Sequence, residues 1–217
     1  MNTALIRTFT YALMLIGIFA MIAFLINHQQ ITAFDERITT MVLRLYSPTT
    51  TAIMKAFTFA GSTLCVTAIA LLVTLMLSMI GYRRELIFFA GVIIGAGILN
   101  LVLKSIFHRA RPDIHRIVEA SGYSFPSGHS MAAITLYGIT IYFLWKHARK
   151  AWLRVVIIIL GAAMIVTIGI SRIYLGVHYP SDVAGGYVMG AAWLAASIGT
   201  YERFLEQRWR SRKFSRI

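Results

Sequence analysis

The sequence predicts an all-α polytopic membrane protein, with six transmembrane helices in a bundle and a short amphipathic helix on the outer surface. Of its 217 residues, 58% are hydrophobic, whereas an ordinary soluble domain has about 45–50%. Crossing a bilayer takes about 20 mostly apolar residues in a helix, and such windows recur along the chain. The windows lie at 8–26, 57–80, 86–103, 127–145, 152–170 and 182–201. We expect residues 1–217 to form one integral-membrane domain.

Charge gives the orientation of these helices. Lys and Arg number 21 against 8 Asp and Glu, a net charge of +13. Short cytoplasmic connections are enriched in Lys and Arg, and most of these cations fall on one side if the N-terminus is cytoplasmic. Both termini are then cytoplasmic in a multi-pass protein of the cell membrane. Nucleic-acid binding is disfavoured, because the basic residues form short clusters between apolar runs.

The C-terminal segment 202–217 is a basic cytoplasmic tail. We expect it to lie against anionic lipid headgroups, although a solvated orientation signal without a partner explains it equally well. Its cations are Arg203, Arg208, Arg210, Arg212, Lys213 and Arg216.

The outer connections are then 27–56, 104–126 and 173–181. Residues 34–43 mix polar and apolar side chains with near-helical spacing and are too polar to span, so an amphipathic helix on the outer surface fits them. Two pairs of glycines with small-xxx-small spacing indicate close helix packing. These pairs are Gly91 with Gly95, and Gly186 with Gly190.

Three segments on the outer side carry polar groups that suit chemistry. The first holds Lys104, Arg109, Arg111 and Arg116, on the side that should be poor in positive charge. Pro112 restricts Arg111 to extended conformations. Lys104 and Arg111 could therefore converge on one anion, although Lys104 alone could simply reach the interface.

The second segment is Pro126, Ser127, Gly128 and His129, at the start of the fourth window. Proline favours a first helical turn, so we expect the backbone N–H groups of the next three residues to face outward. A helix N-terminus of this kind binds phosphate. His129 alone could equally be a structural cap or a buried ring.

The third segment contains Arg172, His178 and Asp182. The spacing of four allows the carboxylate to reach the imidazole, where a bond to Nδ1–H would leave Nε2 free to attack. The alternative is a structural role, in which Asp182 is only a negative charge that stabilises a helix N-terminus. With six spans, all three segments meet on one face.

Together the segments resemble the type-2 phosphatidic acid phosphatase family. Its pattern is Lys, six residues, Arg-Pro; then Pro-Ser-Gly-His; then Ser-Arg, three residues, Gly, one residue, His, three residues, Asp. The chain matches each fixed position from Lys104 to Asp182, Ser171 and Gly176 included.

The resemblance implies an all-helical, metal-independent lipid phosphatase that works through a phosphohistidine. It makes His178 the nucleophile, Asp182 its orienting partner and His129 the acid for the leaving oxygen. The phosphoryl group would be held by Lys104, Arg111, Ser127, Gly128 and Arg172.

We expect no metal and no cofactor, because the acids are scattered and hard cations need several oxygen ligands. The expected substrate is a membrane lipid phosphate, foremost phosphatidylglycerol phosphate, hydrolysed to phosphatidylglycerol at the extracytoplasmic face. Undecaprenyl pyrophosphate is an alternative substrate, because the signature residues would bind the phosphoryl group and not the apolar chain of the lipid. A non-catalytic lipid or anion transporter is the alternative from another class.

Overall fold

The computed structural model describes residues 3–113 and 116–214, and within these ranges every regular element is a helix. The all-α class predicted from the sequence is therefore confirmed for the described residues. The helices are α1 (Thr3–Asn27), α2 (Thr32–Leu43), α3 (Pro48–Ala60), α4 (Thr63–Met79), α5 (Arg83–Phe107), α6 (Gly128–His147), α7 (Ala151–Tyr174) and α8 (Pro180–Phe214). The tail expected at 202–217 continues α8 through Phe214; its side chains after Leu205, with Arg208, Arg210, Arg212, Lys213 and Arg216, lie outside the described residues.

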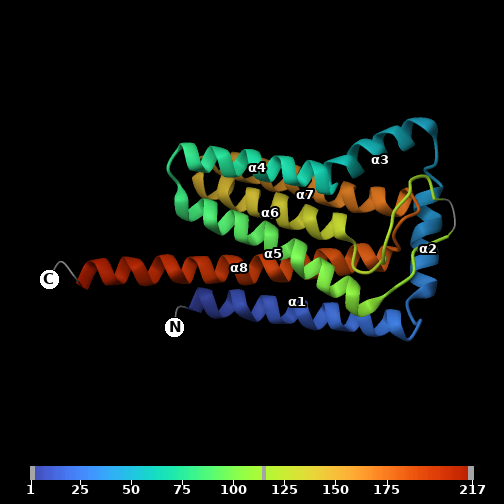
Figure 1. Cartoon of the computed structure of the whole chain (residues 1–217), viewed down its shortest axis with the longest axis horizontal. Helices are drawn as coiled ribbons and strands as arrows, with labels where there is room; N and C mark the ends of the chain where they lie inside the picture. The colour runs from blue at the N-terminus through green and yellow to red at the C-terminus, as the bar shows by residue number, and fades with distance from the viewer. Residues whose placement is uncertain (1–2, 114–115, 215–217) are drawn as a thin grey trace.

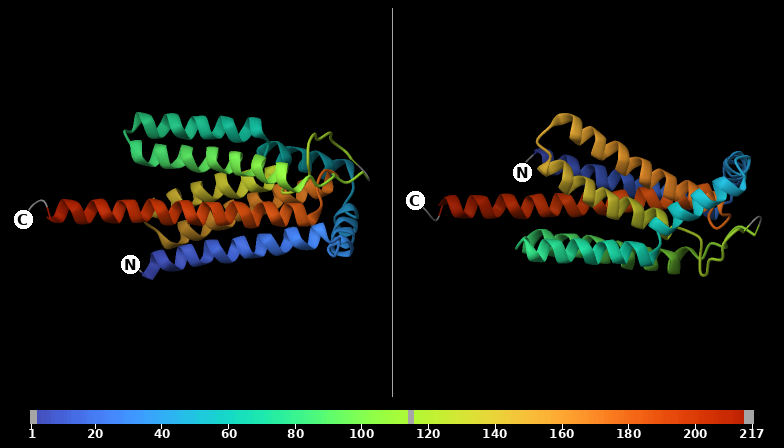
Figure 2. Two further views of the ribbon diagram at one scale, coloured as in Figure 1. Left: turned by 60° about the horizontal axis from the view of Figure 1, so that its bottom comes forward. Right: turned by 90° about the horizontal axis from the view of Figure 1, so that it is seen from above.

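The long helices run side by side, and α2 lies across one end of them (Figure 1). Figure 2 shows α2 nearly end-on at this same end, where the connection between α5 and α6 also lies. The start of α1 and the end of α8 lie at the opposite end. The elements therefore alternate in direction, as the sequence predicts.

Four helices, α1, α5, α7 and α8, are long and apolar enough to cross a membrane, and the bent pair of α3 and α4 makes a fifth candidate. Many large apolar side chains on them are exposed, such as Leu13, Leu101 and Leu160, as expected of surfaces that face lipid. The predicted fourth window, residues 127–145, forms α6 but does not reach the same apolar content. Because α6 packs against α4, α5, α7 and α8, less of its surface would face lipid. Four or five candidate spans are found among the described residues, and the count of six stays a prediction.

The window expected at 57–80 contains a break that the sequence did not predict: it covers the end of α3 and all of α4. The chain bends by 48° between α3 and α4. The break lies at Gly61 and Ser62, where the Ser62 side chain accepts a hydrogen bond from Cys65 N and caps a new helix. A serine N-cap satisfies a donor that a helix start leaves unpaired.

Glycines allow the closest helix contacts. A Cβ at Gly186 on α8 would lie 2.6 Å from the carbonyl oxygen of Ser127, and one at Gly190 would lie 2.3 Å from Ile134 on α6. A Cβ at Gly95 on α5 would meet Trp193 of α8 at 2.2 Å. Gly91 differs, since a Cβ there would meet nothing within 4 Å. The predicted close packing therefore holds for three of the four glycines, and Gly91 opens a groove instead.

We predict that Gly186→Ala destabilises the protein, because the new methyl group meets the Ser127 backbone, which cannot rotate away. Overpacking of this kind costs about 1–3 kcal/mol. The melting temperature of the purified protein in detergent measures the effect. Gly91→Ala is the matched control and should melt at or slightly above the wild-type temperature; equal melting of the two variants would contradict the packing argument.

Candidate functional site

The predicted site residues all lie at the end of the bundle that α2 crosses. They come from helix ends and the turns between them, so the alternating helices bring three distant segments together. Lys104 lies in the last turn of α5, and Arg111 follows in the connection to α6. Ser127 is the N-cap of α6, and Gly128 and His129 lie in its first turn. Arg172 lies in the last turn of α7 and Asp182 in the first turn of α8, with His178 in the turn between these two helices.

The turn after α7 aims His178 into the site. Gly176 has φ +71°, a conformation that other residues adopt only with strain. The N–H groups of Val177 and His178 then return to the carbonyl oxygen of Arg172, at 3.2 and 3.3 Å. The Ser-Arg-x3-Gly-x-His part of the pattern is thus one local fold.

His178 and Asp182 form a buried pair. Their exposed fractions are 3% and 0%, and His178 Nδ1 lies 3.5 Å from Asp182 Oδ2. The buried Ser124 hydroxyl donates to Asp182 Oδ2 and lies 3.3 Å from His178 Nδ1. Tyr179 N–H also donates to Oδ2, at 2.8 Å.

The contacts of His178 favour one tautomer. Arg111 Nη1 lies 3.2 Å from His178 Nε2, and a guanidinium can only donate, so Nε2 presents its lone pair. Nδ1 then carries the hydrogen, on the side of Asp182. Burial lowers the pKa of His178 to about 4, although the Asp182 carboxylate acts in the opposite direction. The imidazole is therefore neutral at physiological pH, with Nε2 facing the cations.

Arg111 and Lys104 are held by main-chain oxygens. Arg111 donates to the carbonyl oxygens of Ser121, Gly122 and Val177, each at 2.9 Å, and Lys104 Nζ donates to the carbonyl oxygen of Tyr123. Burial lowers the pKa of Arg111, but a guanidinium remains charged in proteins. The site thus gathers fixed positive charge.

Arg172 supplies the third cation. It is buried, and its Nη1 donates to the Thr58 hydroxyl of α3. Among the described residues, its Nε is the one buried side-chain nitrogen or oxygen without a hydrogen-bond partner. Leaving a buried charged donor unpaired is costly, so an anion that accepts from it would be stabilised.

The start of α6 differs from the expected phosphate cradle. Pro126 precedes the N-cap, Ser127, and does not occupy the first turn. The N–H of Ser127 donates to the carbonyl oxygen of Asp182 at 3.0 Å, so it does not face outward as predicted. The Ser127 hydroxyl accepts from Ser130 N and Oγ, which leaves its own hydrogen for another acceptor.

His129 follows in the first turn of α6. A Cβ at Gly61, in the α3–α4 bend, would lie 3.4 Å from its ring. His129 is within Coulombic range of Lys104, Arg111, Arg172 and His178. The structure therefore brings both predicted histidines to the same cluster of cations.

The sequence reasoning missed the residues that support Asp182. Arg109 donates to Asp182 Oδ1 at 2.6 Å and to Asp35 Oδ2 at 2.8 Å, and Ser181 also bonds to Asp35. Arg109 was visible only as one member of the outer basic cluster. Nothing in the sequence pattern distinguishes Ser124 or Asp35.

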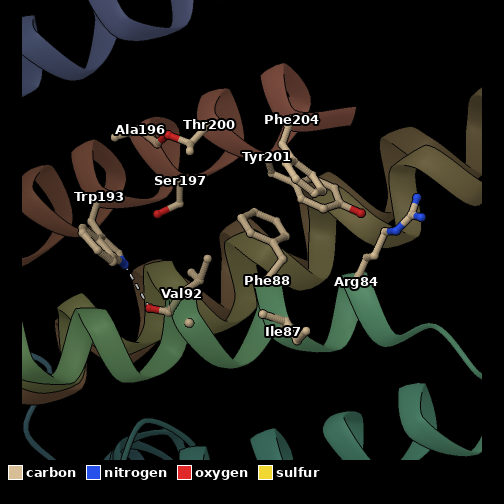
Figure 3. A pocket seen from close by; sticks show the side chains of 11 residues that line it. Arg84, Ile87, Phe88, Val92, Trp193, Ala196, Ser197, Thr200, Tyr201 and Phe204 are labelled. Atoms are coloured by element: carbon tan, nitrogen blue, oxygen red, sulfur yellow. Dashed lines mark hydrogen bonds between the residues drawn. The ribbon is translucent and has the colours of Figure 1, made fainter. Parts of the chain in front are cut away.

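An apolar groove lies elsewhere. About 690 Å³ in volume, it lies between α5 and α8 near Arg84, at the end opposite His178. Figure 3 shows Phe88 stacked on Tyr201 there, and Trp193 donating to the carbonyl oxygen of Val92 at 2.9 Å. The described residues that line it include no histidine or carboxylate, so we do not assign the chemistry to it. Within the described ranges, no three His, Cys, Asp or Glu side chains group as a metal site; metal independence remains a prediction.

One known family matches more than half of the chain. The family model of the PAP2 superfamily matches residues 85–205, a range that includes all three signature segments.

Several similar proteins are named as phosphatases or diphosphatases. Phosphatidylglycerophosphatase B of Bacillus subtilis is 33% identical over 175 residues, 79% of this chain and 85% of that protein. Undecaprenyl-diphosphatase BcrC of the same organism is 30% identical over 112 residues, 49% of this chain and 53% of that protein. The crystal structure of a transmembrane PAP2 type phosphatidylglycerolphosphate phosphatase from Bacillus subtilis superposes with a TM-score of 0.82 at 29% identity, over 88% of this chain and 96% of that one.

We predict that inorganic phosphate stabilises the protein through this cluster of cations. A ligand present at about 100 times its dissociation constant adds about 2.7 kcal/mol of stability. Thermal melting with and without phosphate measures it, and Lys104→Gln should reduce the shift. Arg149→Gln is the control, because Arg149 is exposed in the connection between α6 and α7, at the opposite end of the bundle. Equal shifts in both variants would contradict the assignment.

Proposed function

The chain belongs to the PAP2 superfamily of phosphatases, and from that premise we propose that it hydrolyses a phosphomonoester on a membrane lipid through a phosphohistidine at His178. The orientation of His178 carries this proposal. Nδ1 is directed at buried Asp182, and Nε2 faces Arg111. An arriving phosphoryl group would therefore meet the lone pair where the positive charge is gathered.

In the first step, Nε2 of His178 attacks phosphorus, and the bond from phosphorus to the lipid oxygen breaks. His129 donates a proton to the departing oxygen, which leaves as the lipid alcohol. Lys104, Arg111 and Arg172 hold the phosphoryl oxygens while charge redistributes, with the Ser127 hydroxyl and the Gly128 N–H as further donors.

In the second step, water attacks the phosphohistidine and the phosphorus–nitrogen bond breaks. His129, now neutral, accepts a proton from this water. Asp182 stabilises the positive imidazole ring that exists between the two steps. Phosphate leaves, and His178 is restored.

We propose phosphatidylglycerol phosphate as the substrate, on the extracytoplasmic face of a six-span protein whose termini are cytoplasmic. The similarity to phosphatidylglycerophosphatase B over most of both chains supports this choice. A site at the helix ends, between apolar outer surfaces, suits a phosphate carried on an acyl chain. At the opposite end, exposed Arg84 and Arg203 would meet anionic lipid headgroups.

Undecaprenyl pyrophosphate is the second candidate substrate. The similarity to an undecaprenyl-diphosphatase favours it, and the cations that bind a phosphomonoester would also bind a terminal phosphoryl group of a pyrophosphate.

We predict that His178→Ala removes both turnover and the covalent phosphoenzyme, because it deletes the nitrogen proposed to attack phosphorus. Acid-labile, base-stable labelling with radioactive phosphate measures the intermediate. His147→Ala, at the exposed far end of α6, is the matched control and should label normally. Labelling of the His178 variant would place the nucleophile elsewhere.

We predict phosphate release in excess EDTA, since protein cations take the place that a metal would fill. Purified protein is compared on phosphatidylglycerol phosphate and undecaprenyl pyrophosphate micelles, with His178→Ala as the blank. Faster release from the first supports the proposed substrate, and faster release from the second supports the alternative. Activity that disappears in EDTA and returns with magnesium would refute metal independence, and no release from either lipid would favour a transporter.

A further inference from the structure

The amphipathic helix α2 contributes a buried carboxylate to the active-site end. Asp35 is 2% exposed and is the buried residue of a helix whose other described side chains are exposed or half-buried. An ionised carboxylate is costly to bury unless hydrogen bonds and charges match it. Asp35 therefore points to a specific role for this end of α2.

The partners of Asp35 lie next to the catalytic pair. Oδ1 accepts the N–H of Ser181 at 2.8 Å, and Oδ2 accepts the Ser181 hydroxyl at 2.6 Å and Arg109 Nη2 at 2.8 Å. Ser181 immediately precedes Asp182, so α2 is bonded directly to the first turn of α8.

Arg109 bridges two carboxylates. Its Nη1 donates to Asp182 Oδ1 at 2.6 Å and its Nη2 to Asp35 Oδ2, while its Cζ lies 4.3 Å from the centre of the Tyr179 ring. A planar guanidinium can hold two such partners in one geometry, which an ammonium group cannot. The rotation of the Asp182 carboxylate is thereby fixed, with Oδ1 on Arg109 and Oδ2 toward His178.

The charges indicate why the second carboxylate is needed. Arg109 and Asp182 alone would form a neutral pair, and the field of Asp182 at His178 would be weakened. With Asp35 included, the three groups carry a net charge of −1. A negative charge beside Nδ1 then remains to stabilise the positive ring of a phosphorylated His178.

We propose that Asp35 and Arg109 are positioning residues for the His178–Asp182 pair: Arg109 orients the Asp182 carboxylate, and Asp35 offsets the charge of Arg109. This inference rests on the proposed phosphohistidine reaction. It makes the surface helix α2 part of the catalytic architecture, although none of its side chains needs to touch the substrate.

The test is a charge-compensation cycle on the full-length protein, with phosphatidylglycerol phosphate micelles as the probe. Asp35→Asn leaves Arg109 uncompensated, and we expect kcat to fall about 10- to 100-fold, as for other groups that orient a functional side chain. KM should change little, because Asp35 does not contact substrate. Glu36→Gln is the matched control, since Glu36 is the exposed neighbour on α2 and loses the same charge.

The double variant Asp35→Asn/Arg109→Gln distinguishes an electrostatic role of Asp35 from a purely structural one. Removing both charges restores −1 beside His178, so kcat should rise above that of Asp35→Asn alone. A purely structural role predicts that the double variant is no better than the single one. A double variant without this recovery, or Asp35→Asn with the kcat of Glu36→Gln, would overturn the proposal.

Arg109→Lys covers the case in which Asp35→Asn does not fold. Lysine keeps the charge but cannot bridge both carboxylates, so kcat should fall at unchanged KM, with a melting temperature that shows a folded protein. Wild-type kcat in Arg109→Lys would overturn the proposal. Failure of the proposed function is a separate result, because wild-type protein would then form no phosphoenzyme at His178.

Discussion

The carboxylate of Asp182 is the constraint around which this end of the protein is built. A fully buried negative charge must be matched by donors, and here the donors come from separate parts of the chain. Ser124 and Arg109 reach it from the long connection before α6, and Tyr179 N–H from its own turn. The backbone oxygen of Asp182 accepts a hydrogen bond from Ser127 N–H, so the start of α6 is bonded to the start of α8. The hydrogen bonds to Asp182 thus connect the three parts of the chain that carry the signature.

The polar end contrasts with the apolar body that carries it. Helices satisfy their own backbone groups wherever they lie, which is what a bilayer demands, and their exposed side chains are largely apolar. The glycines on α8 bring α6 and α8 into backbone contact just below the site. The positions of His129 and Asp182 consequently depend on packing that lies outside the site itself.

Local patterns explain what could be predicted from the sequence. Helix positions follow from apolar length, and the relation of His178 to Asp182 follows from a spacing of four with Gly176 before it. The resemblance to a known family covered the same segments, and the family match agrees with it. The bend at Gly61 was missed because hydropathy does not register a serine cap inside an apolar run.

Contacts between distant residues explain what could not be predicted. Asp35 and Ser181 are 146 positions apart, and the polar face of an amphipathic helix gives no sign that one carboxylate points inward. The N–H of Ser127 was expected to face outward, yet it donates a hydrogen bond to the carbonyl oxygen of Asp182 on α8. Gly91 and Gly95 share one spacing pattern, but only Gly95 meets a neighbour closely. Which face of a helix finds a partner depends on the whole arrangement.

Two cations of the site, Lys104 and Arg111, donate hydrogen bonds mainly to main-chain oxygens. Arg111 bonds to the oxygens of Ser121, Gly122 and Val177, and Lys104 to that of Tyr123. A peptide oxygen is present whatever side chain its residue carries. The side chains of Ser121 and Tyr123 can therefore change during evolution without loss of these bonds. An inserted or deleted residue between them would instead displace oxygens that hold Lys104 and Arg111.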